Sequence, residues 1–334
     1  MNKFNKLLLS ALPLFALTLM TSCDGPGTTI EDTVANQMVV EAISQMTTTQ
    51  IDSFEIDVTA DIDYLGKVYD DQLAVVAERH LDASGEVNVK VNDLFEDTAE
   101  GSVEVSASIL AEENDEVLVN SQAGAALYLS EGWAYINLTE AEELFALVEE
   151  EAPDVLTMKT HVGNLATFLE IDPEEPLVMP IDVEEMLPYM NTIENISATQ
   201  KDGELTVVYS VTMNDVVSLY MKVMEDSGEY DPSELTSDEI AEIRTMITQQ
   251  LSSLFNITEV KLTIGVGEDG FLSKLYFDVD IAVTVPGGDD GGHELHEVDA
   301  SLHVDINNMN KLVTVDLPTD LDTYTEVPTE EEPT

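Results

Sequence analysis

The chain has 334 residues, and 68 acids against 12 lysines and arginines give it a formal net charge of −56. A nucleic-acid-binding protein needs a basic face that displaces phosphate counterions, so this charge excludes that class. Hydrophobic residues still make up 44% of the chain, which is enough for the core of one large or two smaller domains.

Residues 1–22 form a segment unlike the rest of the chain. They contain two bases, Lys3 and Lys6, no acid, and an apolar stretch from Leu7 to Met20. A basic start followed by a short apolar stretch is typical of a secretory signal peptide. The stretch is shorter than the roughly 20 residues that a membrane-spanning helix needs. The sequence therefore predicts a signal peptide and not a permanent transmembrane anchor.

The signal segment ends in Leu19-Met20-Thr21-Ser22-Cys23, which contains the only cysteine of the chain. This junction resembles the lipobox of bacterial lipoproteins. The resemblance implies that a lipid is attached to the Cys23 sulfur, that cleavage falls just before it, and that acyl chains such as palmitate anchor the protein to a bacterial membrane. An ordinary signal peptide with an incidental cysteine is the alternative. More than one acyl chain satisfies the requirement for stable anchoring, and no cysteine remains for a disulfide.

Polar segments flank the predicted folded body, which spans residues 31–324. Residues 23–30 contain turn formers and no apolar pattern, so we expect a flexible tether. Residues 325–334 form a polar acidic tail that we expect to be disordered. A proline-containing acidic segment near residues 170–185 either divides the body into two lobes or forms a loop over a single sheet.

Apolar residues at intervals of three and four predict several helices in the body. Thr139 with Glu142, and Thr236 with Glu239, have the spacing of a capping box at a helix start. The predicted helices cover residues 34–46, 139–148, 155–169, 183–190, 214–224 and 236–254.

Alternation of apolar and polar residues predicts long strands between these helices. The clearest strand runs from Phe54 to Tyr64, where every second residue is apolar and the others are acids or threonine. Such alternation is typical of antiparallel strands with one dry and one wet face. The pattern predicts an α+β fold in which a long curved antiparallel sheet packs against amphipathic helices. The other predicted strands contain Val87/Val89/Val91, Val103/Val105/Ala107/Ile109, Leu205/Val207/Tyr209/Val211, Val260/Leu262/Ile264/Val266, Leu275/Phe277/Val279/Ile281/Val283/Val285, Leu302/Val304/Ile306 and Val313/Val315/Leu317.

Three histidines, His293, His296 and His303, gather near the carboxyl end. The order His-Glu-Leu-His-Glu differs from the helical zinc motif, in which two histidines four residues apart share a face. At the start of a strand, His293 and His296 are expected to point to opposite sides. A solvated hairpin rim is therefore the favoured interpretation, and a metal or pH-responsive site at His293 and His296 is the alternative.

No segment matches a nucleophile elbow, a phosphate-binding loop or a calcium-binding loop. Residues 225–231 come nearest to a calcium loop and fail its spacing. Carboxylates are so abundant that they do not single out a catalytic pair. We therefore predict a non-enzymatic protein without a cofactor, whose acidic surface attracts diffuse cations.

The arrangement of the body resembles the lipoprotein-carrier superfamily, which includes periplasmic lipoprotein carriers and mycobacterial lipid-binding lipoproteins. The resemblance implies an incomplete antiparallel β-barrel closed by helices around an apolar cavity that holds acyl chains. It rests on the lipobox, the helix Val34 to Met46 leading into Ser53-Phe54, the Gly270-Phe271-Leu272 hairpin, and Val315-Asp316-Leu317-Pro318 before Tyr324.

The sequence favours one function and leaves one alternative. We expect a membrane-anchored extracytoplasmic lipoprotein that binds or carries a lipid or other amphiphile. The alternative is a ligand-free cell-surface interaction or envelope-adaptation protein with an acidic solvated surface. Six alternating residues are candidates to line the cavity, or else an ordinary packed core: Phe54, Ile56, Val58, Phe277, Val279 and Ile281.

Overall fold

The structure is a computed structural model of the chain. The predicted signal peptide, Cys23, most of the tether and most of the acidic tail lie outside the described residues, as do nearly all of the helices predicted over 139–148 and 183–190. The structure describes residues 28–96, 98–141, 145, 153, 155–164, 190, 192–228, 231–286 and 292–327.

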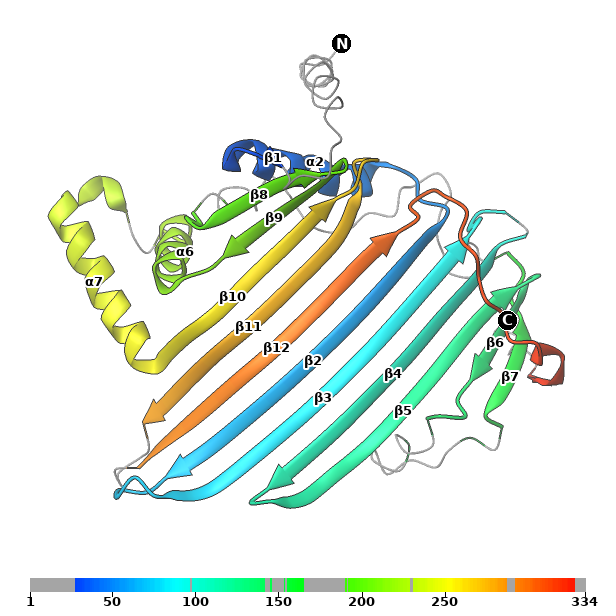
Figure 1. Ribbon diagram of the computed structural model, residues 1–334, viewed down its shortest axis with the longest axis horizontal. Helices are drawn as coiled ribbons and strands as arrows, with labels where there is room; N and C mark the ends of the chain where they lie inside the picture. The colour runs from blue at the N-terminus through cyan, green and yellow to red at the C-terminus, as the bar shows by residue number, and fades with distance from the viewer. Residues whose placement is uncertain are drawn as a thin grey trace, which may run out of the picture.

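The described residues form one sheet of thirteen strands in the order β1-β8-β9-β10-β11-β12-β2-β3-β4-β5-β6-β7-β13 (Figure 1). The neighbours in this order pair antiparallel, except that β13 pairs with β7 in parallel. The outermost strands, β1 and β13, do not pair with each other, so the sheet is not closed. The strands are β1 (Thr28–Thr29), β2 (Phe54–Tyr69), β3 (Val75–Asn92), β4 (Glu100–Glu113), β5 (Glu116–Ser130), β6 (Trp133–Asn137), β7 (Thr157–His161), β8 (Ile196–Lys201), β9 (Glu204–Ser210), β10 (Phe255–Val266), β11 (Leu272–Pro286), β12 (His293–Asn307) and β13 (Thr325–Glu326).

Three helices accompany the sheet in the described part of the chain: α2 (Asp32–Thr48), α6 (Met213–Asp226) and α7 (Ser237–Leu254). Helix α7 begins at the predicted capping box, because the Thr236 side chain accepts from the backbone N–H of Glu239 and the Glu239 side chain accepts from Thr236. Helix α6 begins with the same arrangement between Thr212 and Asp215. The predicted α+β class, with an open antiparallel sheet and amphipathic helices, is confirmed.

Two local predictions are wrong where the structure describes them. Thr157–His161 is strand β7 and not part of a helix, because its backbone completes the ladder beside β6. Residues 312–318 form no regular strand. This segment instead crosses the sheet as an irregular strap, and Val313 is buried where its N–H donates to the Asn92 side chain at 3.2 Å.

The main hydrophobic core lies where α2 packs against one end of the sheet, which we call the α2 end. Val39 of α2 and Val207 and Tyr209 of β9 are fully buried in this core. The Tyr209 hydroxyl donates to the Asn36 side chain at 2.6 Å, so a buried hydrogen bond also joins the helix to the sheet. Burial, with a smaller contribution from Asp32, raises the pKa of Tyr209.

A second hydrophobic cluster lies at the α2 end, on the strands β3 to β6. Leu94 and Ala99, in the turn between β3 and β4, pack against Val91, Leu129 and Ala134. The strap crosses the opposite face of the sheet at this end, and the chain after it reaches Tyr324, whose ring meets that of Tyr135 edge to face. The α2 end is therefore covered by packed elements on both faces of the sheet.

Candidate functional site

The strand register separates the sheet into one apolar and one acidic face. Directly opposed residues of neighbouring strands point to the same face, and alternate residues along a strand point to opposite faces. The apolar face is the one on which α2 packs. Four successive rungs of it, each read from β11 to β5, are Leu275-Val304-Val58-Val87-Val105-Ala125, Phe277-Leu302-Ala60-Gly85-Ala107-Ala123, Val279-Ala300-Ile62-Ala83-Ile109-Ser121 and Ile281-Val298-Tyr64-Leu81-Ala111-Val119.

These four rungs are open to solvent on the strands β11, β12, β2, β3 and β4. Five bulky side chains in this region are 36–44% exposed, whereas apolar residues in a packed core are close to fully buried. Large exposed apolar patches occur at protein, membrane and ligand interaction sites. The five side chains are Leu275, Phe277, Leu302, Ile62 and Val105.

Exposed aliphatic residues continue to the end of the sheet opposite α2, which we call the distal end. The hairpin from β2 to β3 exposes Leu73, Val75 and Val76, and the hairpin from β4 to β5 exposes Val117 and Leu118. Exposed aliphatic side chains therefore also occur at the hairpin tips.

The six predicted lining residues all lie on the apolar face, but in two different environments. Phe54 and Ile56 pack against the core beneath α2. Val58, Phe277, Val279 and Ile281 belong to the four open rungs. The strand register therefore places all six residues on one face, but only Phe54 and Ile56 of the six pack against the core beneath α2.

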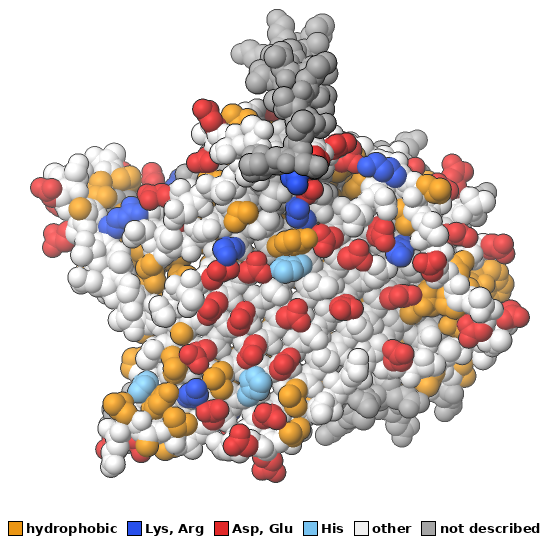
Figure 2. All heavy atoms as spheres, viewed as in Figure 1, with side chains coloured by type: hydrophobic (Ala, Val, Ile, Leu, Met, Phe, Trp, Pro, Cys, Tyr) orange, Lys and Arg blue, Asp and Glu red, His pale blue; other side chains and the backbone are white. Residues whose placement is uncertain are grey.

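The opposite face of the sheet is acidic, as Figure 2 shows by the rows of Asp and Glu side chains across the strands. One rung places five carboxylates directly opposite one another on adjacent strands, and like charges in such positions destabilise a sheet. This aspartate ladder consists of Glu259, Asp280, Asp299, Asp63 and Asp82. No group of three His, Cys, Asp or Glu side chains suited to hold a metal ion occurs among the described residues.

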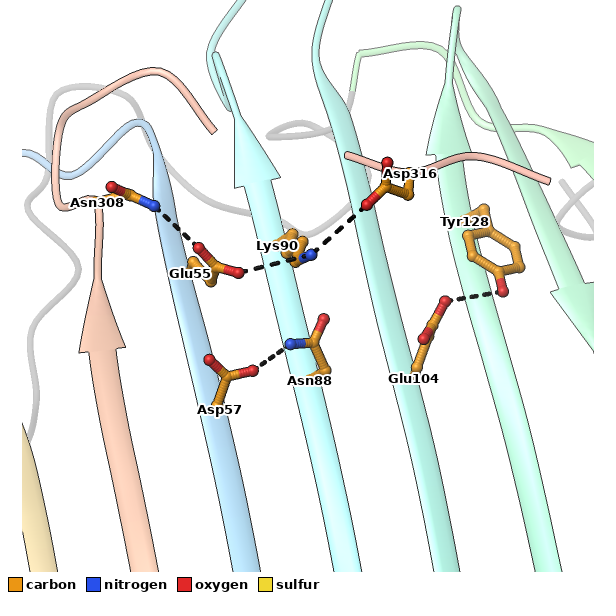
Figure 3. Close-up of polar contacts among 8 residues, drawn as sticks. All are labelled: Glu55, Asp57, Asn88, Lys90, Glu104, Tyr128, Asn308 and Asp316. Carbon is orange, nitrogen blue, oxygen red and sulfur yellow. Dashed lines mark hydrogen bonds and ion pairs between the residues drawn. The ribbon is translucent and has the colours of Figure 1, made fainter. Parts of the chain in front are cut away.

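Near the α2 end, polar contacts occupy the acidic face (Figure 3). Lys90 lies 3.5 Å from Glu55 and 3.9 Å from Asp316 of the strap, so one base joins the sheet to the strap. The Tyr128 hydroxyl donates to Glu104 at 3.0 Å. Burial, followed by this hydrogen bond, raises the pKa of Tyr128 to about 12.

A hollow of about 330 Å³ opens beside these contacts on the acidic face. Three glutamates line it, together with amide and hydroxyl groups. Such a lining is unsuited to an acyl chain, because burying carboxylates against hydrocarbon costs free energy. The charged and amide residues of the lining are Glu86, Glu104, Glu140, Asn88 and Asn137.

The histidines do not converge in the structure. His293 stacks on Tyr69, with 4.5 Å between ring centroids, and points to the acidic face. His296 lies on the apolar face, where its Nδ1 is 2.8 Å from the Tyr64 hydroxyl. His303 is bonded to Asp278 at 2.8 Å. The expected opposite orientation of His293 and His296 is confirmed, and it separates the two proposed metal ligands.

Sequence reasoning missed the distal part of the apolar face. The alternation in β3 continues outward from Val87 through Gly85, Ala83, Leu81 and Arg79, but small residues and one arginine weaken its apolar signal. A lone arginine at the parity of an apolar face is the signal that marks the distal boundary of that face.

Comparisons with known proteins supply no family. No protein-family model and no curated protein matches the chain. A β-barrel-like protein of unknown function (DUF1849) from Brucella abortus is 9% identical, with 77% of this chain and 99% of that chain covered, at a TM-score of 0.12. OpdQ from Pseudomonas aeruginosa is 6% identical, with coverages of 77% and 98%, at a TM-score of 0.16. Similarities this low carry no information about function. None of the described helices is long and apolar enough to cross a membrane.

Proposed function

We propose that the protein is a membrane-anchored extracytoplasmic lipoprotein whose open apolar face binds the acyl chains of a lipid or other amphiphile. The observation that carries this proposal is the solvent exposure of bulky aliphatic and aromatic side chains in the centre of the sheet. Phe277, Leu302 and Ile62 lie on three adjacent strands and are 41–44% exposed.

An acyl chain suits this surface because both are apolar over a comparable extent. Strands lie about 4.8 Å apart and advance about 3.4 Å per residue, so the four rungs across β11 to β4 cover roughly 20 Å in each direction. Each methylene group transferred from water to such a surface contributes about 0.8 kcal/mol. The surface is uneven, because a row of small residues, Ala60, Gly85 and Ala107, lies beside the bulkier row Val58, Val87 and Val105.

The acidic face is consistent with this proposal. It carries a dense coat of solvated carboxylates (Figure 2), which keeps a protein with an exposed apolar face soluble. The ligand-free alternative lacks an explanation for the exposed apolar rungs, although the acidic coat suits it equally well.

Amphiphile binding is tested with the mature chain carrying Cys23→Ser, purified without detergent. We expect native mass spectrometry to show a stoichiometric lipid, and cis-parinaric acid to become fluorescent on the protein at micromolar concentration. An empty protein that neither carries a lipid nor binds the probe contradicts the proposal.

The location of binding is tested with Phe277→Ser and Leu302→Ser, which each remove apolar contact area from the open rungs. We expect each to weaken probe binding about tenfold, because a lost aromatic or leucine contact of about 1.4 kcal/mol corresponds to that factor. The matched control is Leu312→Ser, since Leu312 is 83% exposed but lies outside the sheet. Equal losses in all three variants place the probe elsewhere.

The membrane anchor is tested separately. Replacing Cys23 with Ala removes the only sulfur that can carry the lipid, so we expect the protein to leave the membrane fraction. Unchanged membrane retention of the Cys23→Ala chain contradicts the anchor and leaves the amphiphile-binding proposal standing.

A further inference from the structure

The apolar face ends at a charged boundary on its distal side. The rung that follows the four open rungs reads Val283, His296, Gly66, Arg79 and Glu113 from β11 to β4. Glu294, two residues from His296 on the same strand face, lies one rung further out. We call Tyr64, Arg79, Glu113, Glu294 and His296 the distal polar cluster.

The members of this cluster are held in position by contacts with one another. Arg79 Nε donates to Glu113 Oε1 at 3.0 Å, and His296 Nε2 lies 3.3 Å from Glu294 Oε2. The Tyr64 ring leans over Gly66, where an added Cβ would lie 2.5 Å from the tyrosine oxygen, and this brings the hydroxyl to His296. The hydrogen bond to Glu113, together with the attraction of the Glu113 charge, raises the pKa of Arg79.

Arg79 differs from the other lysines and arginines of the sheet in its position. Among the strands that the structure describes, it is the only lysine or arginine at an apolar-face position of the register. Its side chain is 65% exposed. Within the described residues, its two terminal amines make no hydrogen bond, and a guanidinium presents these donors in a fork that fits a phosphate or carboxylate.

The distal polar cluster carries both positive and negative charge, and it lies next to the four open rungs that we propose to bind acyl chains. Arg79 provides donors for an anion, whereas the Tyr64 hydroxyl and the His296 imidazole are engaged with each other and with Glu294. Glu113 and Glu294 provide carboxylates for a cation, and they lie 40% and 48% exposed. A group that carries only negative charge meets repulsion from the two glutamates. A zwitterion can instead pair its negative charge with Arg79 and its positive charge with the glutamates.

We propose that the distal polar cluster binds the head of the amphiphile, and that this head contains a phosphate next to a primary ammonium group, as in an ethanolamine phospholipid. This inference rests on the proposed function, because the acyl chains on the open rungs place the head at the cluster. In the complex, the phosphate oxygens accept from Arg79, and the ammonium donates to Glu294.

The experiment compares three probes with the same acyl chain: lysophosphatidylethanolamine, lysophosphatidylglycerol and monoacylglycerol. Each displaces cis-parinaric acid from the Cys23→Ser chain below its critical micelle concentration. We expect lysophosphatidylethanolamine to bind tightest in the wild-type chain, at least about fivefold better than lysophosphatidylglycerol. Equal or tighter binding of lysophosphatidylglycerol overturns the assignment of a zwitterionic head.

Two variants separate the halves of the head group. Arg79→Gln should weaken both phosphate-bearing probes about tenfold, the loss typical of one charge-assisted hydrogen bond, and leave monoacylglycerol unchanged. Glu294→Gln should weaken only lysophosphatidylethanolamine. Lys67→Gln is the matched control, because Lys67 is a base at the same end of β2 whose register position is on the acidic face.

The possible failures remain distinguishable. Absence of binding by all three probes in the wild-type chain defeats the proposed function itself. Normal binding of all three probes by Arg79→Gln defeats only the assignment of the head-group site. An equal loss for monoacylglycerol in Arg79→Gln shows a structural role for Arg79 and also overturns the assignment.

Discussion

Two regions of one apolar sheet face, the α2 end and the four open rungs, differ in what covers them. At the α2 end, Val207 and Tyr209 are fully buried beneath a helix, whereas Phe277 and Ile62 further along the same face are about two-fifths exposed. The alternation of apolar and polar residues is the same in both regions. The pattern therefore determines which face a side chain occupies, and tertiary packing determines whether that face becomes core or stays exposed to solvent.

The largest expected effect comes from placing one charge in the core beneath α2 and one in the open rungs. Val39→Asp puts an unpaired carboxylate into the core beneath α2, so we expect the free energy of unfolding to fall by at least about 3 kcal/mol. Ile62→Asp leaves its carboxylate in water, so the loss should stay below about 1 kcal/mol. Urea unfolding of both variants measures the difference. Similar losses would show that the open rungs are packed, and would contradict the comparison.

Alkaline pH should act selectively on the covered end. Burial raises the pKa of Tyr209 above its ordinary value of 10.0 in the folded protein. The unfolded chain then loses the tyrosine proton first, so stability is intact below pH 10 and falls by about 1.4 kcal/mol per pH unit above it for this one group. Unfolding of wild type and Tyr209→Phe from pH 9 to 12 tests this expectation. The Phe variant should show a shallower loss, and parallel curves would rule out a contribution from Tyr209.

The sequence predicts much of this architecture because its signals are local. Period-two alternation identifies β2, β11 and the face on which Val58 and Phe277 lie, and capping-box spacing identifies the start of α7. Both signals depend on residues within a few positions of each other.

The remaining features depend on contacts that are distant in the chain. Thr157–His161 lies within residues 155–169, whose apolar spacing is helix-like, but its backbone pairs with β6 as a strand. The exposure of Ile62 depends on which elements pack over the sheet, and the distal polar cluster joins residues 64, 79 and 296 through strand register. No short window of sequence contains this information.

The two capping boxes extend the comparison between covered and uncovered groups. Burial alone favours a raised pKa for Asp215, but hydrogen bonds from Thr212 and from the backbone N–H of Glu194 outweigh it and hold the pKa below 3.8. Its contribution is therefore present above about pH 4 and is lost as the pH falls through the lowered pKa. Asp215→Asn should cost about 1–2 kcal/mol at pH 7, measured by urea unfolding. Glu239→Gln should cost less, because the capping box of α7 is exposed. An equal cost in both variants would show that burial does not strengthen the contribution of the capping carboxylate.

The smallest expected effect concerns the acidic face, behind the open rungs. Asp299 lies between Asp280 and Asp63 in the aspartate ladder, so removing its charge relieves two cross-strand repulsions. Asp299→Asn should raise the free energy of unfolding by about 0.5 kcal/mol at low ionic strength. At 1 M salt the Debye length is about 3 Å, so the gain should vanish there. A gain that persists at high salt indicates a packing effect of the amide, whereas a salt-sensitive gain shows that repulsion within the acidic coat lowers the stability of the fold.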